Sequence, residues 1–181
     1  MSAGRKGFTV TDETKLEARV KSLERALAVR DDVEAIKRLK YRYFRCLDSK
    51  LWDELAECFT EDATTSYSGG KYGFQGGDAI IKFLREGLCQ TRISMHHGHH
   101  PEIEITGDST ATGVWALEDC VIDTQFNLGI RGAAFYRDEY VKENGQWKIR
   151  STGYMRVFEE MWDRGESKSL KITANMHESS G

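Results

Sequence analysis

The sequence predicts an α+β domain in which helices come first and a long antiparallel sheet follows. Amphipathic helical patterns dominate the first half of the chain, up to about residue 90, and strand-like segments fill the second half. A doubly wound α/β fold would instead alternate the two element types. With 181 residues, the chain has the length of one domain with a single hydrophobic core.

Three parts are expected along the chain: an N-terminal extension over residues 1–30 that is partly helical, a folded domain over residues 31–160, and a tail over residues 161–181. In the extension, apolar residues repeat at alternating spacings of four and three, as in a coiled-coil seam: Leu16, Val20, Leu23 and Leu27. Two heptads are too few to predict a coiled coil. The tail is partly amphipathic, so we expect it to pack on a neighbour or over a pocket mouth.

The domain itself begins with three predicted helices. Asp31 with Glu34 three residues later resembles a helix start, and the apolar face that follows predicts a helix over residues 31–47. Residues 51–59 form a second amphipathic segment, which pairs with the first as a helical hairpin. Asp78 is placed to cap a third helix with apolar residues at Ile80, Ile81, Phe83 and Leu84.

The remaining elements are predicted strands. Two short strands flank residues 68–70 (SGG), and Asn144-Gly145 favours the primed two-residue turn of a β-hairpin. Four long strands are expected at residues 92–105, 109–123, 129–143 and 146–160. Strands of this length twist and curl, so three helices that close one face leave a concave side able to hold a ligand.

Composition excludes several classes of protein. The formal net charge is −3 and the isoelectric point is near 6.0, without a basic stripe, so we expect no nucleic-acid partner. No run approaches 18 apolar residues and the first ten residues lack a signal core, so we expect a cytoplasmic protein without a membrane partner. No CxxC pair occurs, which predicts reduced, buried thiols at Cys46, Cys58, Cys89 and Cys120.

Four of the five histidines lie in one short run: His96, His97, His99 and His100. Imidazole has a pKa near neutrality, so the run suggests either proton transfer or metal binding. Strand alternation puts His97 and His99 on one face and His96 and Gly98 on the other.

The metal alternative rests on His97, His99 and Glu104, whose HxH-plus-carboxylate spacing is similar to that of a cupin site. Such sites gain another histidine from a later strand, and none occurs between His100 and His177. We therefore favour proton transfer and predict no metal and no cofactor.

Other polar residues admit two readings each. Asp48, between the first two helices, is either a helix N-cap or a functional carboxylate, and Tyr43 on the apolar helix face is either core or functional. Asp119 shares the parity of Trp115 and Leu117, which predicts that it faces inward. Arg156 on the last strand is either a surface ion-pair partner or part of a site.

Three segments together resemble the SnoaL-like branch of the NTF2-like superfamily: residues 43–55 (YFRCLDSKLWDEL), 74–80 (FQGGDAI) and 145–149 (GQWKI). This family implies a cone-shaped α+β barrel, in which a curved antiparallel sheet is closed by three helices. Within it, the chain is most similar to the bile-acid 7α-dehydratases, relatives of scytalone dehydratase, through residues 43–48, 93–96, 115–119, 132–136 and 152–156.

The resemblance implies a functional set of Tyr43, Asp48, His96, Asp119 and Arg156, no cofactor and a homotrimer. The implied activity is a cofactor-independent dehydration of a small hydrophobic substrate, a hydroxylated oxo-steroid or similar polycyclic compound, either free or as a CoA thioester.

In that reaction His96 would move the proton, with Asp119 or Asp48 orienting its ring. Tyr43 would hydrogen-bond the carbonyl as charge builds there, and Arg156 would anchor a carboxylate or hold the acidic pair. The same fold also allows a ketosteroid-type isomerase, a polyketide cyclase, or a protein that only binds a hydrophobic ligand.

Overall fold

The computed structural model describes residues 10–177 and confirms the α+β class. Its elements, in chain order, are α1 (Val10–Asp48), α2 (Trp52–Ala56), β1 (Phe59–Tyr67), β2 (Tyr72–Gln75), α3 (Gly77–Gly87), β3 (Arg92–Gly107), β4 (Thr110–Asp123), β5 (Leu128–Glu143), β6 (Gln146–Asp163) and the short 3-10 helix η1 (Arg164–Glu166). The last four strands were predicted to within three residues at each end.

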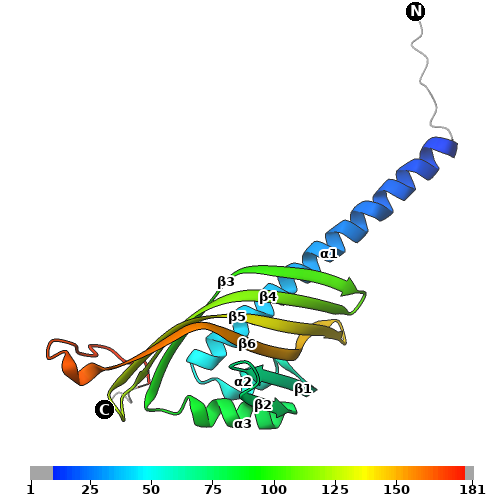
Figure 1. Cartoon of the computed structure of the whole chain (residues 1–181). Coiled ribbons are helices and arrows are strands. Elements are labelled where there is room, and N and C mark those ends of the chain that lie inside the picture. The colour runs from blue at the N-terminus through cyan, green and yellow to red at the C-terminus, as the bar shows by residue number, and fades with distance from the viewer. Residues whose placement is uncertain (1–9, 178–181) are drawn as a thin grey trace, which may run out of the picture.

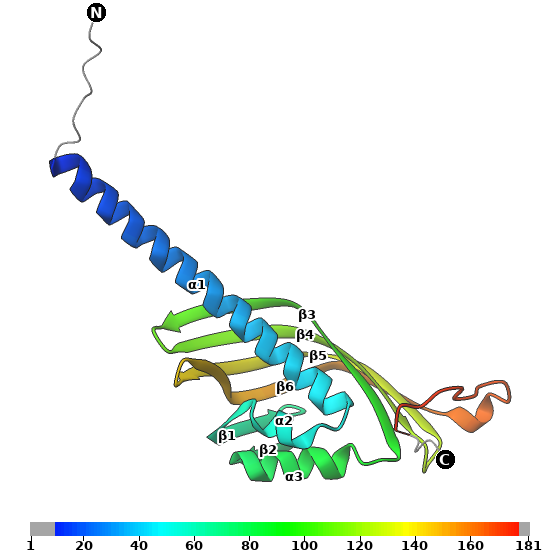
Figure 2. The ribbon, with the colours of Figure 1, turned by 180° about the vertical axis from the view of Figure 1, so that it is seen from behind.

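One curved sheet holds all six strands, in the order β2-β1-β6-β5-β4-β3. The expectation of an antiparallel sheet is wrong at one point, because β1 pairs with β6 in parallel. The sheet does not close on itself, and α1 lies across its concave face (Figures 1 and 2). Helices α2 and α3 complete the cover, α3 beside β1 and β2.

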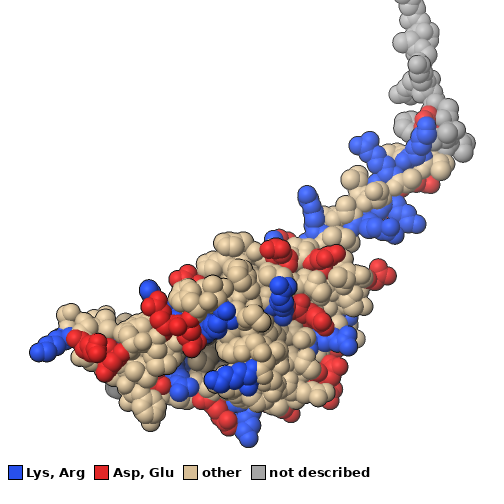
Figure 3. All heavy atoms as spheres, in the orientation of Figure 1, with Lys and Arg blue, Asp and Glu red and all other residues tan. Residues whose placement is uncertain are grey.

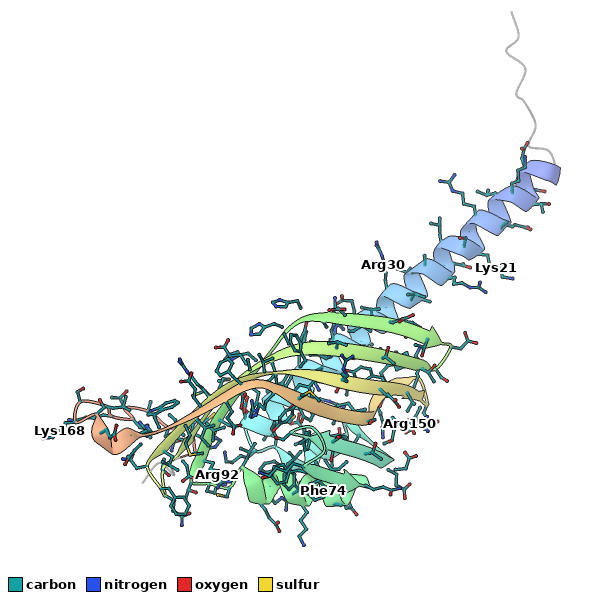
Figure 4. The ribbon with its side chains drawn as sticks, viewed as in Figure 1. Lys21, Arg30, Phe74, Arg92, Arg150 and Lys168 are labelled. Atoms are coloured by element: carbon teal, nitrogen blue, oxygen red, sulfur yellow. The ribbon has the colours of Figure 1, made fainter. Side chains whose placement is uncertain are left out.

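Helix α1 differs most from the sequence prediction. Asp31 does not begin a helix, since α1 runs unbroken from Val10 to Asp48. No proline or glycine interrupts these residues, and strong helix formers dominate them, so nothing ends the helix between the extension and the domain. The first half projects from the body, where Lys21 and Arg30 point into solvent (Figure 4) and both signs of charge are exposed (Figure 3).

The other two helices are shorter or begin differently than expected. Helix α2 ends at Ala56, because Phe59 already belongs to β1. Asp78 does not cap α3: Gly76 occupies the N-cap position with φ 88°, a left-handed conformation that favours glycine. Asp78 lies in the first turn instead, where its carboxylate interacts favourably with the helix dipole.

The tight turn between β5 and β6 is the predicted Asn144-Gly145 pair, with φ values of 50° and 79°. The core lies between the concave face and the helices and includes Ile36, Leu55, Ile80, Trp115 and Ile149, all fully buried. Among the helices within residues 10–177, none combines the length and the apolar character needed to span a bilayer.

The cysteines follow the prediction in part. All four are free, and Cys46 and Cys58 are buried in the core. Cys89 and Cys120 are exposed, which contradicts the prediction for these two. Cys120 follows the inward-facing Asp119 on β4, so strand alternation turns its side chain outward.

Candidate functional site

The last residue of α1, Asp48, contacts the first part of β3. Asp48 Oδ1 lies 2.7 Å from His96 Nδ1, and Asp48 Oδ2 accepts a hydrogen bond of 2.8 Å from the His96 backbone N–H. The Ser94 hydroxyl donates to Oδ1 at 2.8 Å. The interpretation of Asp48 as a helix N-cap is therefore wrong. Asp48 is the last residue of α1, and its carboxylate accepts hydrogen bonds from Ser94 and His96 of β3.

A glycine permits this close approach of helix and strand. A Cβ atom added at Gly98 would lie 2.3 Å from Cε2 of Phe44 on α1. Because only a hydrogen atom occupies that place, the helix can lie against β3 and deliver Asp48 to His96. The predicted alternation is also confirmed, as His96 pairs with the inward-facing Asp119 and His97 with the exposed Glu118.

His96 lowers the pKa of Asp48, and Asp48 in turn hydrogen-bonds the His96 ring. Burial by itself would raise the pKa of Asp48, but the hydrogen bonds and charge of His96, with the Ser94 hydroxyl, outweigh it and lower this pKa. An ionised Asp48 accepts the Nδ1 proton of His96, so the Nε2 lone pair is left for other use. The His96 side chain is 11% exposed, which gives it limited access to the cavity described below.

The second carboxylate has a different partner. Asp119 is 3% exposed and receives both terminal nitrogens of Arg156, Nη2 at 3.0 Å from Oδ2 and Nη1 bonded to Oδ1. Burial would lower the pKa of Arg156, yet the Asp119 carboxylate outweighs it and raises this pKa. Of the two partners left open for His96, the structure pairs Asp48 with it and gives Asp119 to Arg156.

Tyrosines form the third part of the site. Tyr43 is 1% exposed, and its hydroxyl lies 3.4 Å from that of Tyr67. Burial raises the pKa of Tyr43 well above its ordinary value, so this group is a neutral hydrogen-bond donor near pH 7. The ring of Tyr136 packs edge-on against that of Tyr43, with 6.4 Å between centroids.

These groups open on one cavity of about 190 Å³ between the sheet and the helices. Four of the five predicted site residues line it, namely Tyr43, His96, Asp119 and Arg156, and Asp48 lies behind His96. The rest of its wall is mostly aromatic and aliphatic, with Tyr67, Phe83, Leu88 and Val121 among the lining residues.

Sequence reasoning missed Tyr67 and Tyr136 as members of this wall. A signal existed for Tyr136, which is two residues from Ala134 and from Asp138 on β5 and therefore shares their buried face. Tyr67 ends β1 and reaches the cavity through the parallel pairing of β1 with β6. A pattern within one strand does not report such a pairing.

The remaining histidines of the run lie outside the cavity. His97, His99 and His100 are exposed, with their rings stacked in sequence at 6.0 and 5.6 Å between centroids. Within the described part of the chain, no three histidine, cysteine, aspartate or glutamate side chains are grouped to hold a metal ion. The cupin-like arrangement of His97, His99 and Glu104 is therefore not formed.

Comparisons with known proteins agree with this architecture. The family model of the SnoaL-like domain matches residues 28–153. A protein of Novosphingobium aromaticivorans, provisionally described as a scytalone dehydratase, is 26% identical, with a TM-score of 0.67 over 71% of this chain and 86% of that one.

Two dehydrochlorinases share the fold. A type 2 hexachlorocyclohexane dehydrochlorinase LinA is 21% identical, with a TM-score of 0.68 over 78% of this chain and 93% of its own. LinA type 3 from Novosphingobium barchaimii is 16% identical, with a TM-score of 0.71 over 83% and 99%. At these identities the likeness concerns the fold alone.

Proposed function

Because the chain belongs to the SnoaL-like family, we propose that it is a cofactor-independent lyase that eliminates water from a hydroxylated oxo-steroid or a similar polycyclic compound, free or as a CoA thioester. The observation that carries the proposal is the Asp48–His96 pair beside a cavity that also holds Tyr43 and the Asp119–Arg156 pair. Two of the similar structures are named for eliminations, of water in one case and of hydrogen chloride in the other.

The proton transfer falls to His96. Its Nε2 lone pair takes a proton from the carbon activated by the substrate carbonyl, and Asp48 stabilises the imidazolium that results. The same imidazolium then returns the proton to the departing hydroxyl, the C–O bond breaks, and the double bond forms as water leaves. Asp119 is not the acid in this scheme, because both of its carboxyl oxygens already accept hydrogen bonds from Arg156.

Negative charge that reaches the carbonyl oxygen during proton removal needs a hydrogen-bond donor. Tyr43 is neutral and buried at the cavity wall, and burial strengthens such a hydrogen bond. Arg156 also lines the cavity, with its positive charge paired to Asp119. These two residues therefore act on the oxyanion and on the orientation of the substrate.

The size of the cavity bears on the substrate. About 190 Å³ is below the roughly 300 to 1,000 Å³ of most small-molecule pockets. We place only the reacting ring and its neighbour inside the aromatic wall, with the rest of a polycyclic skeleton extending beyond it. A charged or thioester-linked end of the substrate would then remain in water.

Activity tests the proposal directly. The protein is offered a 7α-hydroxy-3-oxo-4-ene steroid, as the free acid and as a CoA thioester, and the conjugated diene is followed by its absorbance. We expect product from at least one form, and none from His96→Ala. Absence of product from both forms at saturating substrate would refute the proposal for this class.

Movement of a double bond without loss of water would instead identify an isomerase. The absorbance of the conjugated diene and the mass of the product separate the two outcomes, because only the dehydration lowers the mass by one water. Tight binding without any product would indicate a carrier of hydrophobic ligands.

We also propose that three copies assemble through the convex face of the sheet. Large apolar side chains are exposed there, with Phe135 51%, Met155 68% and Val157 62% accessible. A hollow of about 710 Å³ opens among them, and Figure 3 shows this face with broad uncharged areas between scattered charges. An apolar area of this kind marks an interaction surface, and a homotrimer is the assembly that the family resemblance implies.

A further inference from the structure

One buried charged residue near the cavity, Lys40, has no role in the proposed mechanism. Lys40 on α1 is completely buried, and its ammonium lies 2.8 Å from Asp138 Oδ2 on β5. Both side chains have no exposed surface. Burying an ion pair costs free energy that a well-packed apolar pair avoids. A contribution to stability alone is therefore a weak explanation for a buried Lys40–Asp138 pair.

The carboxylate of Asp138 is held firmly in place. Tyr140 and Thr152 each donate a hydroxyl hydrogen bond of 2.6 Å to it, and the indole N–H of Trp115 in turn donates to the Tyr140 hydroxyl at 2.9 Å. These side chains fix the position of Asp138, and Asp138 fixes the position of the Lys40 ammonium.

The ammonium faces the rings of the cavity wall. Its nitrogen lies 3.8 Å from the ring centroid of Tyr136 and 4.6 Å from that of Tyr43. Both tyrosines line the cavity, so their rings separate Lys40 from the space that the substrate would fill. A cation over an aromatic face is attracted by the ring, and the attraction grows when the ring carries negative charge.

We infer that Lys40 is a positioning residue of the cavity, whose ammonium stabilises negative charge transmitted to the rings of Tyr136 and Tyr43 when their hydroxyls hydrogen-bond an oxyanion. The inference rests on the proposed function and adds a charged group behind its hydrogen-bond donors. Lys40 contacts no reacting atom, so it acts only through the two tyrosines.

The charge balance around the tyrosines supports this role. Burial raises the pKa of Tyr136 well above its ordinary value, and the negative charge of Asp138 contributes in the same direction. Burial lowers the pKa of Lys40, while the adjacent Asp138 carboxylate favours the ammonium form. The ammonium thus places a positive charge directly against the rings of both phenols.

The test uses 2-naphthol, a two-ring phenol whose ionised form is a stable oxyanion, and needs no turnover. The pKa of the bound ligand is measured from naphtholate fluorescence for the wild type and for the charge-free pair Lys40→Met with Asp138→Asn. We expect the pKa of bound naphthol to rise by about one unit in this variant, a tenfold loss in preference for the oxyanion. Thr152→Val is the matched control, because it alters the same network but keeps the ammonium.

A second pair, Lys40→Leu with Asp138→Leu, guards against a folding defect in the first, and circular dichroism establishes which pairs fold. The inference is overturned if a folded pair prefers naphtholate over naphthol as strongly as the wild type does. It is also overturned if neither the wild type nor the folded pair binds naphtholate detectably, or if neither pair folds. If the wild type also dehydrates the steroid, the variant should lose about tenfold in kcat with KM unchanged. If it does not, the naphthol result still decides the role of Lys40 while the proposed reaction fails.

Discussion

Asp48 accepts hydrogen bonds from two nitrogens of a single residue, the ring Nδ1 and the backbone N of His96, at 2.7 and 2.8 Å. The first bond orients the imidazole and the second fixes the strand that carries it. Ring orientation and strand position are therefore set by one carboxylate at the end of α1. This relationship gives Asp48 two separable effects, one on activity and one on stability.

The effect on activity is measured with two variants. His96→Ala removes the proposed base and should lower kcat by roughly 100- to 10,000-fold. Asp48→Asn keeps the shape but loses the negative charge that stabilises the imidazolium, and we expect a loss of up to about 10,000-fold, as for the carboxylate that orients the histidine of a catalytic triad. Steady-state kinetics on the steroid substrate measure both, and a wild-type rate in His96→Ala would exclude this assignment.

The effect on stability depends on pH. The pKa of Asp48 is lowered by folding, so the folded state favours the carboxylate and gains stability above the unfolded pKa of about 3.9. This contribution is lost as the pH falls through the lower pKa of the folded state. The free energy of unfolding should therefore fall more steeply below pH 4 in the wild type than in Asp48→Asn, as urea titrations would show. Parallel curves for the two proteins would contradict the pKa shift.

Removal of Arg156 should be costly while removal of the whole pair should not. In Arg156→Met the buried Asp119 carboxylate loses its partner, and we expect a destabilisation of about 3 kcal/mol. Arg156→Met combined with Asp119→Asn leaves no unpaired buried charge at this position and should recover most of this loss. Denaturant unfolding of the three proteins measures the difference. A double variant no more stable than the single one would rule out a coupling between the two residues.

The close approach at Gly98 predicts sensitivity to one methyl group. Gly98→Ala would place a carbon against the ring of Phe44, so we expect a loss of roughly 1 to 3 kcal/mol and a weaker contact between Asp48 and His96. Gly87→Ala is the control, because its added carbon would meet no atom within 4 Å. Thermal unfolding compares the two, and equal melting temperatures would mean that α1 and β3 can move apart at no cost.

The proposed trimer predicts a mass of about three times the 20.6 kDa chain in sedimentation at micromolar concentration. Val157→Lys places a charge on the exposed convex face and should shift the protein toward monomer without loss of folding. Glu166→Lys, in η1 outside that face, serves as a charge control. A monomeric wild type would refute the proposal.

The sequence predicted much of the sheet because its signals are local. Alternation along β3 and β4 placed His96 and Asp119 on the inner face, and Asn144-Gly145 marked the last hairpin. The beginning of α1 was predicted at the wrong residue because Asp31 and Glu34 also occur inside helices, where their charges face solvent. A cap signature is thus informative only where the preceding residues cannot be helical.

Partners within the site were not predictable for a different reason. Asp48 and His96 are 48 residues apart, and either carboxylate had the charge needed to orient the ring. The choice depended on the packing of α1 against β3, which Gly98 and Phe44 set. Lys40 lies four residues after Ile36 and four before Phe44, on the apolar face of α1, but its partner Asp138 is 98 residues away and was not predictable from that spacing.

The unbroken course of α1 has a mechanical meaning. A helix of 39 residues is a rod of about 58 Å, hydrogen-bonded along its whole length and without a hinge residue. The carboxylate that steers the imidazole is the inner end of this rod, and the outer end stands in water. A force that tilts or pulls the outer end would therefore be transmitted through the helix to Asp48, on which the proposed proton transfer by His96 depends.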